Sequence, residues 1–180
     1  MRPRGFRRRI FLGAPLCLLG GCGFTPLYAP ISTGGSSGAP SSDLAKVFVA
    51  VIPDRPGQLL REALQVRLEG SGTHEARIYT LRVNYGVSSE AIGFNPDSSS
   101  SYVRFRASAN WSLLPLAPGS PALTAGLATA MDGYSVIVNQ YFYTDLYNAT
   151  IYRRLADEIA EQIVLRLAGY FRNQAKLARR

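Results

Sequence analysis

The spacing of hydrophobic residues changes along the chain, and each spacing predicts a different element. Residues 46–52 are rich in β-branched and aromatic residues and end before a proline, which is typical of a short buried strand. Over residues 56–68, Leu60, Leu64 and Leu68 recur at every fourth position with polar residues between them. Because an α-helix turns once in 3.6 residues, this spacing predicts an amphipathic helix.

Two later segments alternate between apolar and polar residues instead. Residues 76–87 and 102–113 place apolar side chains on one face and polar side chains on the other. Residues 122–134 show a weaker form of the same pattern. A period of two predicts antiparallel strands that are covered on one face only.

From about residue 143 the period becomes helical again. Apolar residues recur at every fourth position as Leu155, Ile159, Ile163, Leu167 and Phe171. The predicted order is therefore β-α-β-β-β-α. It indicates an α+β fold, a two-layer sandwich in which two helices cover one face of a sheet. The sheet is expected to have about four strands and to be mixed but mostly antiparallel.

Residues 1–21 are typical of a secretory signal peptide. Five arginines precede an uncharged, mostly apolar run over residues 10–19, and two glycines stand directly before Cys22. The apolar run is about half of the roughly 20 residues that a membrane-spanning helix needs. The segment 19–22 (Leu-Gly-Gly-Cys) resembles the bacterial lipobox, which implies cleavage before Cys22 and lipid attachment to it. Gly23 is not the aspartate of an inner-membrane retention signal, so the outer membrane is favoured.

The remainder of the chain divides into three parts. Residues 22–42, rich in Gly, Ser and Pro, are expected to be a lipidated N-terminus and flexible tether. Residues 43–172 are expected to form a single domain, and residues 173–180 a basic tail. The export route stays open, because residues 8–12 look like a twin-arginine signal as well as an ordinary basic start.

The net charge is concentrated outside the domain. The chain has 20 Lys and Arg against 12 Asp and Glu, a net charge of +8. Five of the basic residues belong to the signal peptide, and four more (Arg172, Lys176, Arg179 and Arg180) lie near the C-terminus. The body of the domain is therefore about neutral, which argues against a nucleic-acid-binding protein.

Catalytic and metal-binding patterns are poorly represented in the sequence. His74 is the one histidine, Cys17 leaves with the signal, and Cys22 is expected to be acylated. Residues 34–38 match the Gly-x-Ser-x-Gly hydrolase motif, but they lie in the tether rather than between a strand and a helix. We expect neither enzymatic activity nor a metal or cofactor.

The polar face of the predicted strands offers a candidate binding site. Arg104 and Arg106 are two residues apart, so both guanidinium groups project from the same face beside Tyr102. Arg82 could join them from a neighbouring strand if the register allows it. Arginine clusters bind phosphate through paired hydrogen bonds, although a merely solvated face would have the same composition.

Two segments resemble a known family. The sequence Cys-Gly-Phe-Thr-Pro-Leu-Tyr over residues 22–28 is similar to the N-terminus of the lipopolysaccharide (LPS) assembly lipoproteins of the LptE type. Residues 147–167 resemble the C-terminal helix of that family. The resemblance implies an outer-membrane lipoprotein that plugs and helps to assemble the LPS translocon, a large β-barrel of the LptD type. It also implies binding of LPS in transit, for which Arg104, Arg106 and Arg82 are the candidates on chemical grounds.

Aromatic residues are the candidates for contact with the barrel. These are Tyr102, Tyr141, Phe142, Tyr143 and Tyr147. Two other classes stay open, an auxiliary lipoprotein of an envelope phospholipid-transport ABC system and a periplasmic hydrolase, for which no nucleophile stands out.

Overall fold

The computed structural model describes residues 40–69, 76–96, 100–117, 119–136 and 141–178. Its elements, in chain order, are α1 (Pro40–Ala45), β1 (Val47–Val49), α2 (Arg55–Glu69), β2 (Tyr79–Phe94), β3 (Ser100–Pro115), β4 (Thr124–Ser135) and α3 (Tyr141–Leu177). No helix in these ranges is long and apolar enough to cross a membrane.

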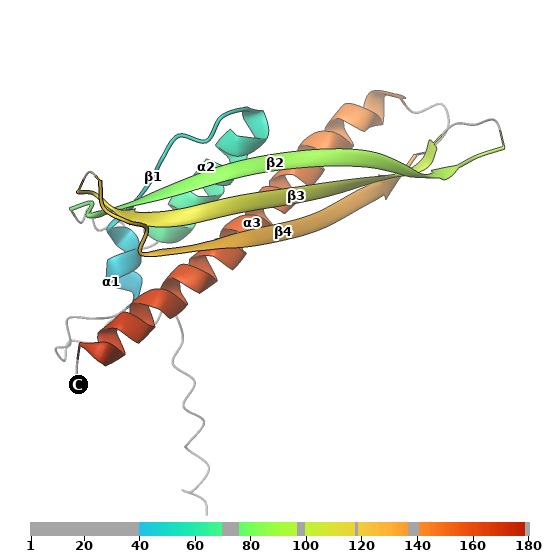
Figure 1. Ribbon diagram of the computed structural model, residues 1–180. Coiled ribbons are helices and arrows are strands. Elements are labelled where there is room, and N and C mark those ends of the chain that lie inside the picture. The colour runs from blue at the N-terminus through green and yellow to red at the C-terminus, as the bar shows by residue number, and fades with distance from the viewer. Residues whose placement is uncertain (1–39, 70–75, 97–99, 118, 137–140, 179–180) are drawn as a thin grey trace, which may run out of the picture. The chain divides into compact units, whose positions relative to one another are not determined.

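The four strands form one mixed sheet in the order β1-β2-β3-β4. β1 runs parallel to β2, while β2, β3 and β4 form an antiparallel meander. Figure 1 shows α2 and α3 on the same side of the three long strands. The predicted α+β sandwich, with its mixed and mostly antiparallel sheet, is therefore confirmed.

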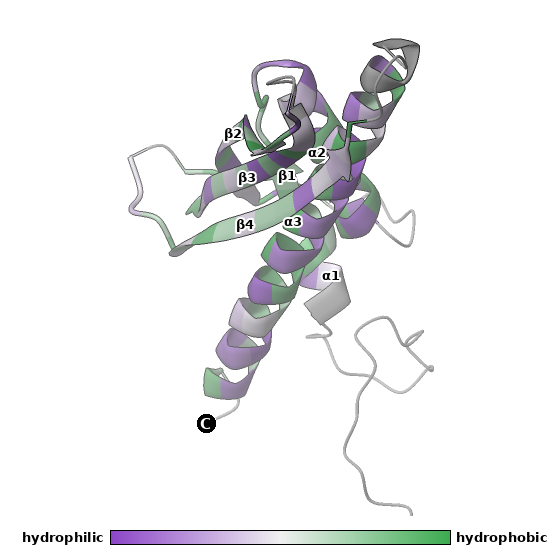
Figure 2. Cartoon of the chain, turned by 90° about the vertical axis from the view of Figure 1, so that its right-hand side faces the viewer, coloured by the Kyte–Doolittle hydropathy of each residue, from purple (hydrophilic) through white to green (hydrophobic). Residues whose placement is uncertain are grey.

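The hydrophobic core lies between the helices and one face of the sheet. The leucines of α2 predicted to face inwards are buried, and so are all five residues of the repeat in α3. From the middle strands of the sheet, Leu81, Phe105, Trp111 and Leu113 are buried in this core. Along α3, hydrophobic and hydrophilic residues alternate in bands, as an amphipathic helix requires (Figure 2). Burial of each Leu or Ile side chain contributes roughly 1.5–3 kcal/mol to the free energy of folding, so this core holds the two layers together.

Several element boundaries differ from the sequence prediction. α1 was not predicted, and it occupies residues 40–42 of the expected tether. β1 is only three residues long because the chain turns away before α2, where Asp54 has a φ of 63°. β2 and β3 are longer than predicted because their hairpin continues past the point where hydrophobic alternation stops. Residues 88–92 are all exposed, so no apolar period marks that part of β2.

The last helix also extends further than predicted. α3 begins at Tyr141 and continues to Leu177, and it therefore includes residues 173–177 of the expected basic tail. Residues 172–174 and 176–178 are exposed. The hydrophobic repeat ends at Phe171, where the helix stops covering the core, so the pattern marked the end of burial rather than the end of the helix.

Candidate functional site

The sheet face opposite the helices, here called the open face, is left uncovered by the described helices. Its side chains come from alternate positions of the three long strands, and each of them is exposed or half-buried. On β2 they are Arg82, Asn84, Gly86, Ser88 and Glu90; on β3, Tyr102, Arg104, Arg106, Ser108, Asn110 and Ser112; on β4, Ala125, Leu127, Thr129, Met131 and Gly133.

The open face divides into a polar part and an apolar part. The side chains of β2 and β3 are hydroxyls, amides and charged groups, whereas β4 carries Ala125, Leu127 and Met131, which we call the apolar stripe. Leu127 is 49% exposed and Met131 57% exposed. An exposed apolar row with polar neighbours is a common feature of protein contact surfaces. The groups of this face are suited to binding by hydrogen bonds, ion pairs and apolar contact.

The apolar stripe was missed in the sequence. Residues 122–134 show only weak alternation because both faces of this strand carry apolar residues. Ala128 and Ala130 lie on the covered face, and Leu127 and Met131 lie on the open face. The signal that would have revealed the stripe is that Leu127 and Met131 are odd-numbered, whereas the buried alanines of the same strand are even-numbered.

The three candidate arginines occupy different environments. Arg104 Nη2 forms an ion pair with Glu90 Oε1 at 2.7 Å, so its charge is largely compensated. Arg106 lies opposite Ser88 and Met131, is exposed, and has no ion-pair partner among the described residues.

Arg82 does not join this pair. It lies opposite Ser112, which is six positions from Arg106 in β3, or about 20 Å along the strand. The structure therefore brings Arg104 and Arg106 together and leaves Arg82 at the other end of the open face.

Tyr102 lies on the open face, over a glycine of the edge strand. A Cβ atom added to Gly133 would lie 2.5 Å from Tyr102 Oη and 2.6 Å from the carbonyl oxygen of Val103. The ring therefore occupies the space that a side chain at position 133 would need. Tyr102 is 38% exposed and stands in the same row of β3 as Arg104 and Arg106.

Tyr147 belongs to an aromatic cluster between the covered face and the first turns of α3. Its ring stacks on Tyr134, with centroids 5.4 Å apart, and Tyr134 in turn stacks on Phe105 at 6.1 Å. Tyr152 meets Phe105 edge-on at 5.7 Å. Tyr147 thus packs against its own sheet, and 44% of it remains exposed for other contacts.

Some predicted residues cannot be placed in this site. Tyr141, Phe142 and Tyr143 form the first turn of α3, but their side chains lie outside the described part of the structure. Cys22 and His74 also lie outside the described residues.

Three tyrosines of the covered face, Tyr79, Tyr85 and Tyr134, have a hydroxyl pKa that is raised first of all by burial. Burial, and then the neighbouring Tyr152, raises the pKa of Tyr85 to about 12. Tyr85 Oη is buried and has no hydrogen-bond partner within the described structure. The pKa of Tyr134 is also raised, first by burial and then by Tyr152 and Asp145. The phenols of Tyr85 and Tyr134 therefore stay neutral at physiological pH.

Comparison with known proteins relates the fold to lipoprotein structures. No model of a known protein family matches the sequence, and no curated protein matches it. A solved structure from Caulobacter crescentus, described as a lipoprotein, is 22% identical, with a TM-score of 0.59 over 73% of this chain and 95% of that one. A minor lipoprotein from Acinetobacter baumannii is 18% identical, with a TM-score of 0.54 over 69% and 92% of the two chains.

A third solved structure shares the same architecture. Rare lipoprotein B from Shewanella oneidensis is 12% identical, with a TM-score of 0.51 over 73% of this chain and 96% of that one. Because each of these structures is matched over nearly its whole length, the similarity covers a complete domain. This chain has the fold of these lipoprotein structures.

Proposed function

We propose that this protein is an outer-membrane lipoprotein that binds an LPS-assembly β-barrel of the LptD type and contacts LPS during its insertion into the outer membrane. The observation that carries the proposal is the open face, three strands wide, which no described helix covers. A monomeric two-layer domain gains nothing from an apolar stripe in water, so this surface fits a protein partner.

The composition of the open face agrees with a contact inside a hydrated protein assembly. Leu127 and Met131 supply apolar contact area, while the serines and asparagines of β2 and β3 offer hydrogen-bonding groups around it. Protein interfaces combine an apolar centre with a polar rim that retains water. A plug within a large barrel would meet both kinds of surface.

The positive charge of the open face supports contact with a phosphorylated lipid. Arg106 has no ion-pair partner in the described structure, and it lies next to the compensated pair of Arg104 and Glu90. A guanidinium group offers paired hydrogen bonds to phosphate oxygens, which are stronger than neutral hydrogen bonds. We therefore assign the first LPS phosphate contact to Arg106, with Arg104 in support.

Membrane attachment rests on Cys22 and on the lipoproteins that share the fold. The segment before Cys22 resembles a lipobox, and two or more acyl chains on that residue would anchor the domain stably. The solved structures of similar fold are described as lipoproteins, which supports this reading. The protein supplies binding surfaces in this proposal and no catalytic group.

The proposed function is tested by purifying the tagged full-length chain from outer membranes in mild detergent. We expect a large barrel, identified by mass spectrometry as the LPS-assembly protein, at a constant ratio to the bait. Recovery of the bait alone would contradict the proposal.

Depletion of the protein separates this function from phospholipid transport. The proposal predicts loss of LPS from the cell surface. Unchanged surface LPS together with disturbed phospholipid asymmetry would instead support an auxiliary lipoprotein of a phospholipid-transport system.

A further inference from the structure

The edge strands of the sheet expose rows of backbone groups that could pair with another strand. Directly after β4, the N–H of Val136 donates to the carbonyl of Ser101, so the even-numbered residues of β4 point their backbone groups towards β3. The odd-numbered residues, including Leu127 and Thr129, therefore point theirs away from the sheet. Such an unpaired row is a template for strand addition by another chain.

Two side chains of α3 bind the outward carbonyls of β4. Gln162 Nε2 donates to the carbonyl of Thr129 at 2.9 Å, and Arg166 Nη1 donates to the carbonyl of Leu127 at 2.6 Å. Residues four apart on a helix are separated by about 6 Å, and residues two apart on a strand by about 6.7 Å. The two spacings match, so one face of α3 can follow the edge of β4 in the antiparallel direction.

The same edge is blocked further along by a local contact. Asp132 Oδ1 accepts a hydrogen bond from the N–H of Gly133 at 2.8 Å, and Arg154 Nη1 lies 3.9 Å from the other oxygen of that carboxylate. From Leu127 to Gly133, the outward backbone groups of β4 therefore have three side-chain partners. An incoming strand would have to displace them.

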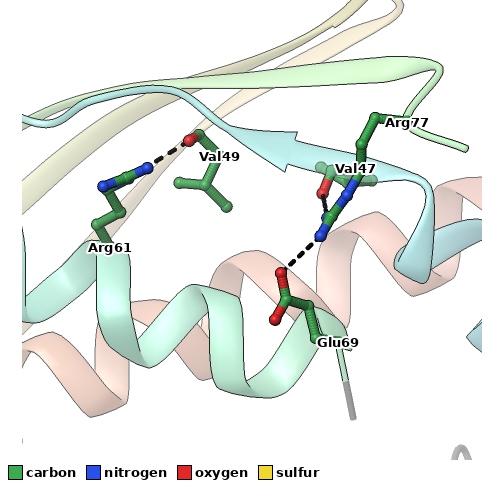
Figure 3. A network of polar contacts seen from close by, with 5 residues as sticks. All are labelled: Val47, Val49, Arg61, Glu69 and Arg77. Carbon is green, nitrogen blue, oxygen red and sulfur yellow. Dashed lines mark hydrogen bonds and ion pairs between the residues drawn. The ribbon is translucent and has the colours of Figure 1, made fainter. Parts of the chain in front are cut away.

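The opposite edge has the same arrangement. The carbonyl of Val47, in β1, accepts a hydrogen bond from Arg77 Nη1 at 2.6 Å, and Arg77 is held by an ion pair with Glu69 at 2.6 Å. Arg61 Nε points at the carbonyl of Val49 from 3.5 Å. Figure 3 shows the guanidinium groups of Arg61 and Arg77 directed at the backbone carbonyls of β1.

We propose that these side chains close both edges of the sheet to strand addition by a second copy of this chain. A guanidinium group that is covered by an incoming strand would lose its hydration, which costs free energy unless it finds a new partner. The occupant that the closure excludes is a second copy of this chain, paired through β4 antiparallel to its own β4. The closure of the edges is independent of the proposed function.

The test removes the two helix side chains at the β4 edge. The full chain with Gln162→Ala and Arg166→Ala is compared in detergent with the parent and with a matched control, Arg172→Ala with Asn173→Ala. The control also removes one arginine and one amide from α3, at exposed positions without a contact to a strand. Self-association is measured by sedimentation, and backbone amide exchange is followed over residues 127–131.

The edge variant should self-associate at least about tenfold more tightly than the parent, a difference of about 1.4 kcal/mol. The outward amides of Leu127, Thr129 and Met131 should exchange more slowly in the associated species, while the control behaves as the parent does. Equal association of variant and parent would overturn the proposal. Association without slower exchange over residues 127–131 would overturn it too.

A third substitution separates strand addition from aggregation of unfolded protein. The N–H of Thr129 points away from the sheet, so Thr129→Pro removes no hydrogen bond of the sheet but prevents pairing at this edge. Added to the edge variant, Thr129→Pro should restore the association of the parent. Association that persists in the triple variant would show that it does not run through the β4 edge.

Discussion

The buried hydroxyl of Tyr85 makes a sharp prediction about stability. Tyr85 is 9% exposed and faces the covered side of β2, and its Oη has no hydrogen-bond partner within the described structure. Leaving a buried hydroxyl without a partner costs about 1–3 kcal/mol, and Tyr85→Phe removes that cost while it keeps the ring. Some of the gain is lost because the space of the oxygen is left empty, so we expect a net stabilisation of about 1 kcal/mol.

The gain is measurable by urea and thermal unfolding. For a domain of this size, about 1 kcal/mol corresponds to a rise of about 4 °C in Tm. The matched control is Tyr170→Phe, because Tyr170 Oη is exposed and accepts a hydrogen bond from Gln174 at 3.1 Å. The control should change the stability by no more than about 0.5 kcal/mol.

The pH dependence gives an independent readout of the same group. The pKa of Tyr85 is about 12 in the folded protein and 10.0 in an unperturbed tyrosine. Between pH 10 and 12 the folded state therefore keeps a proton that the unfolded state releases. Tyr85 thus leaves the free energy of unfolding unchanged below pH 10 and lowers it as the pH rises towards 12. Tyr85→Phe should flatten that loss.

Two results would refute this reasoning. A Phe variant that is less stable than the parent by 1 kcal/mol or more would mean that the hydroxyl has a favourable partner. An unchanged fall in stability between pH 10 and 12 would mean that Tyr85 does not titrate as its burial implies.

Three further predictions concern the open face. Gly133→Ala should destabilise the fold by about 1–3 kcal/mol in urea unfolding, because the new methyl group meets the β3 backbone as well as the ring of Tyr102. An unchanged urea midpoint would contradict this packing of Tyr102 over Gly133. Arg106→Glu should weaken the binding of purified LPS by roughly tenfold, whereas Arg82→Glu, the same charge change at the other end of the open face, should weaken it less. Equal losses in the two variants would point to a diffuse charge effect. Leu127→Ser with Met131→Ser should leave thermal stability within about 0.5 kcal/mol but reduce recovery of the barrel; undiminished recovery would remove the apolar stripe from the interface.

The architecture could be predicted because its two layers leave different periods in the sequence. Leu60, Leu64 and Leu68 repeat at the helical spacing because one side of α2 is buried, and residues 102–113 alternate because the helices cover one face of β3. Burial on one side is what converts structure into a sequence pattern. The hairpin beyond residue 88 of β2 has no covered side and therefore left no pattern.

The candidate site could be predicted only in part. Alternation placed Arg104 and Arg106 on one face, but the distance to Arg82 depends on the register between β2 and β3, which is set by the length of their hairpin. The ion pair of Arg104 with Glu90 depends on the same register. Likewise, the contacts of Gln162 and Arg166 with β4 join residues more than 30 positions apart, and no local pattern reveals them.

Site-specific photo-crosslinking in intact cells tests the central claim most directly. A photoreactive residue at Ser108, in the middle of the open face, is compared with one at Glu161, which is exposed on α3. The proposal predicts an adduct between the Ser108 probe and the LPS-assembly barrel. Absence of that adduct, with the barrel crosslinked from Glu161 instead, would show that the helices and not the open face meet the partner.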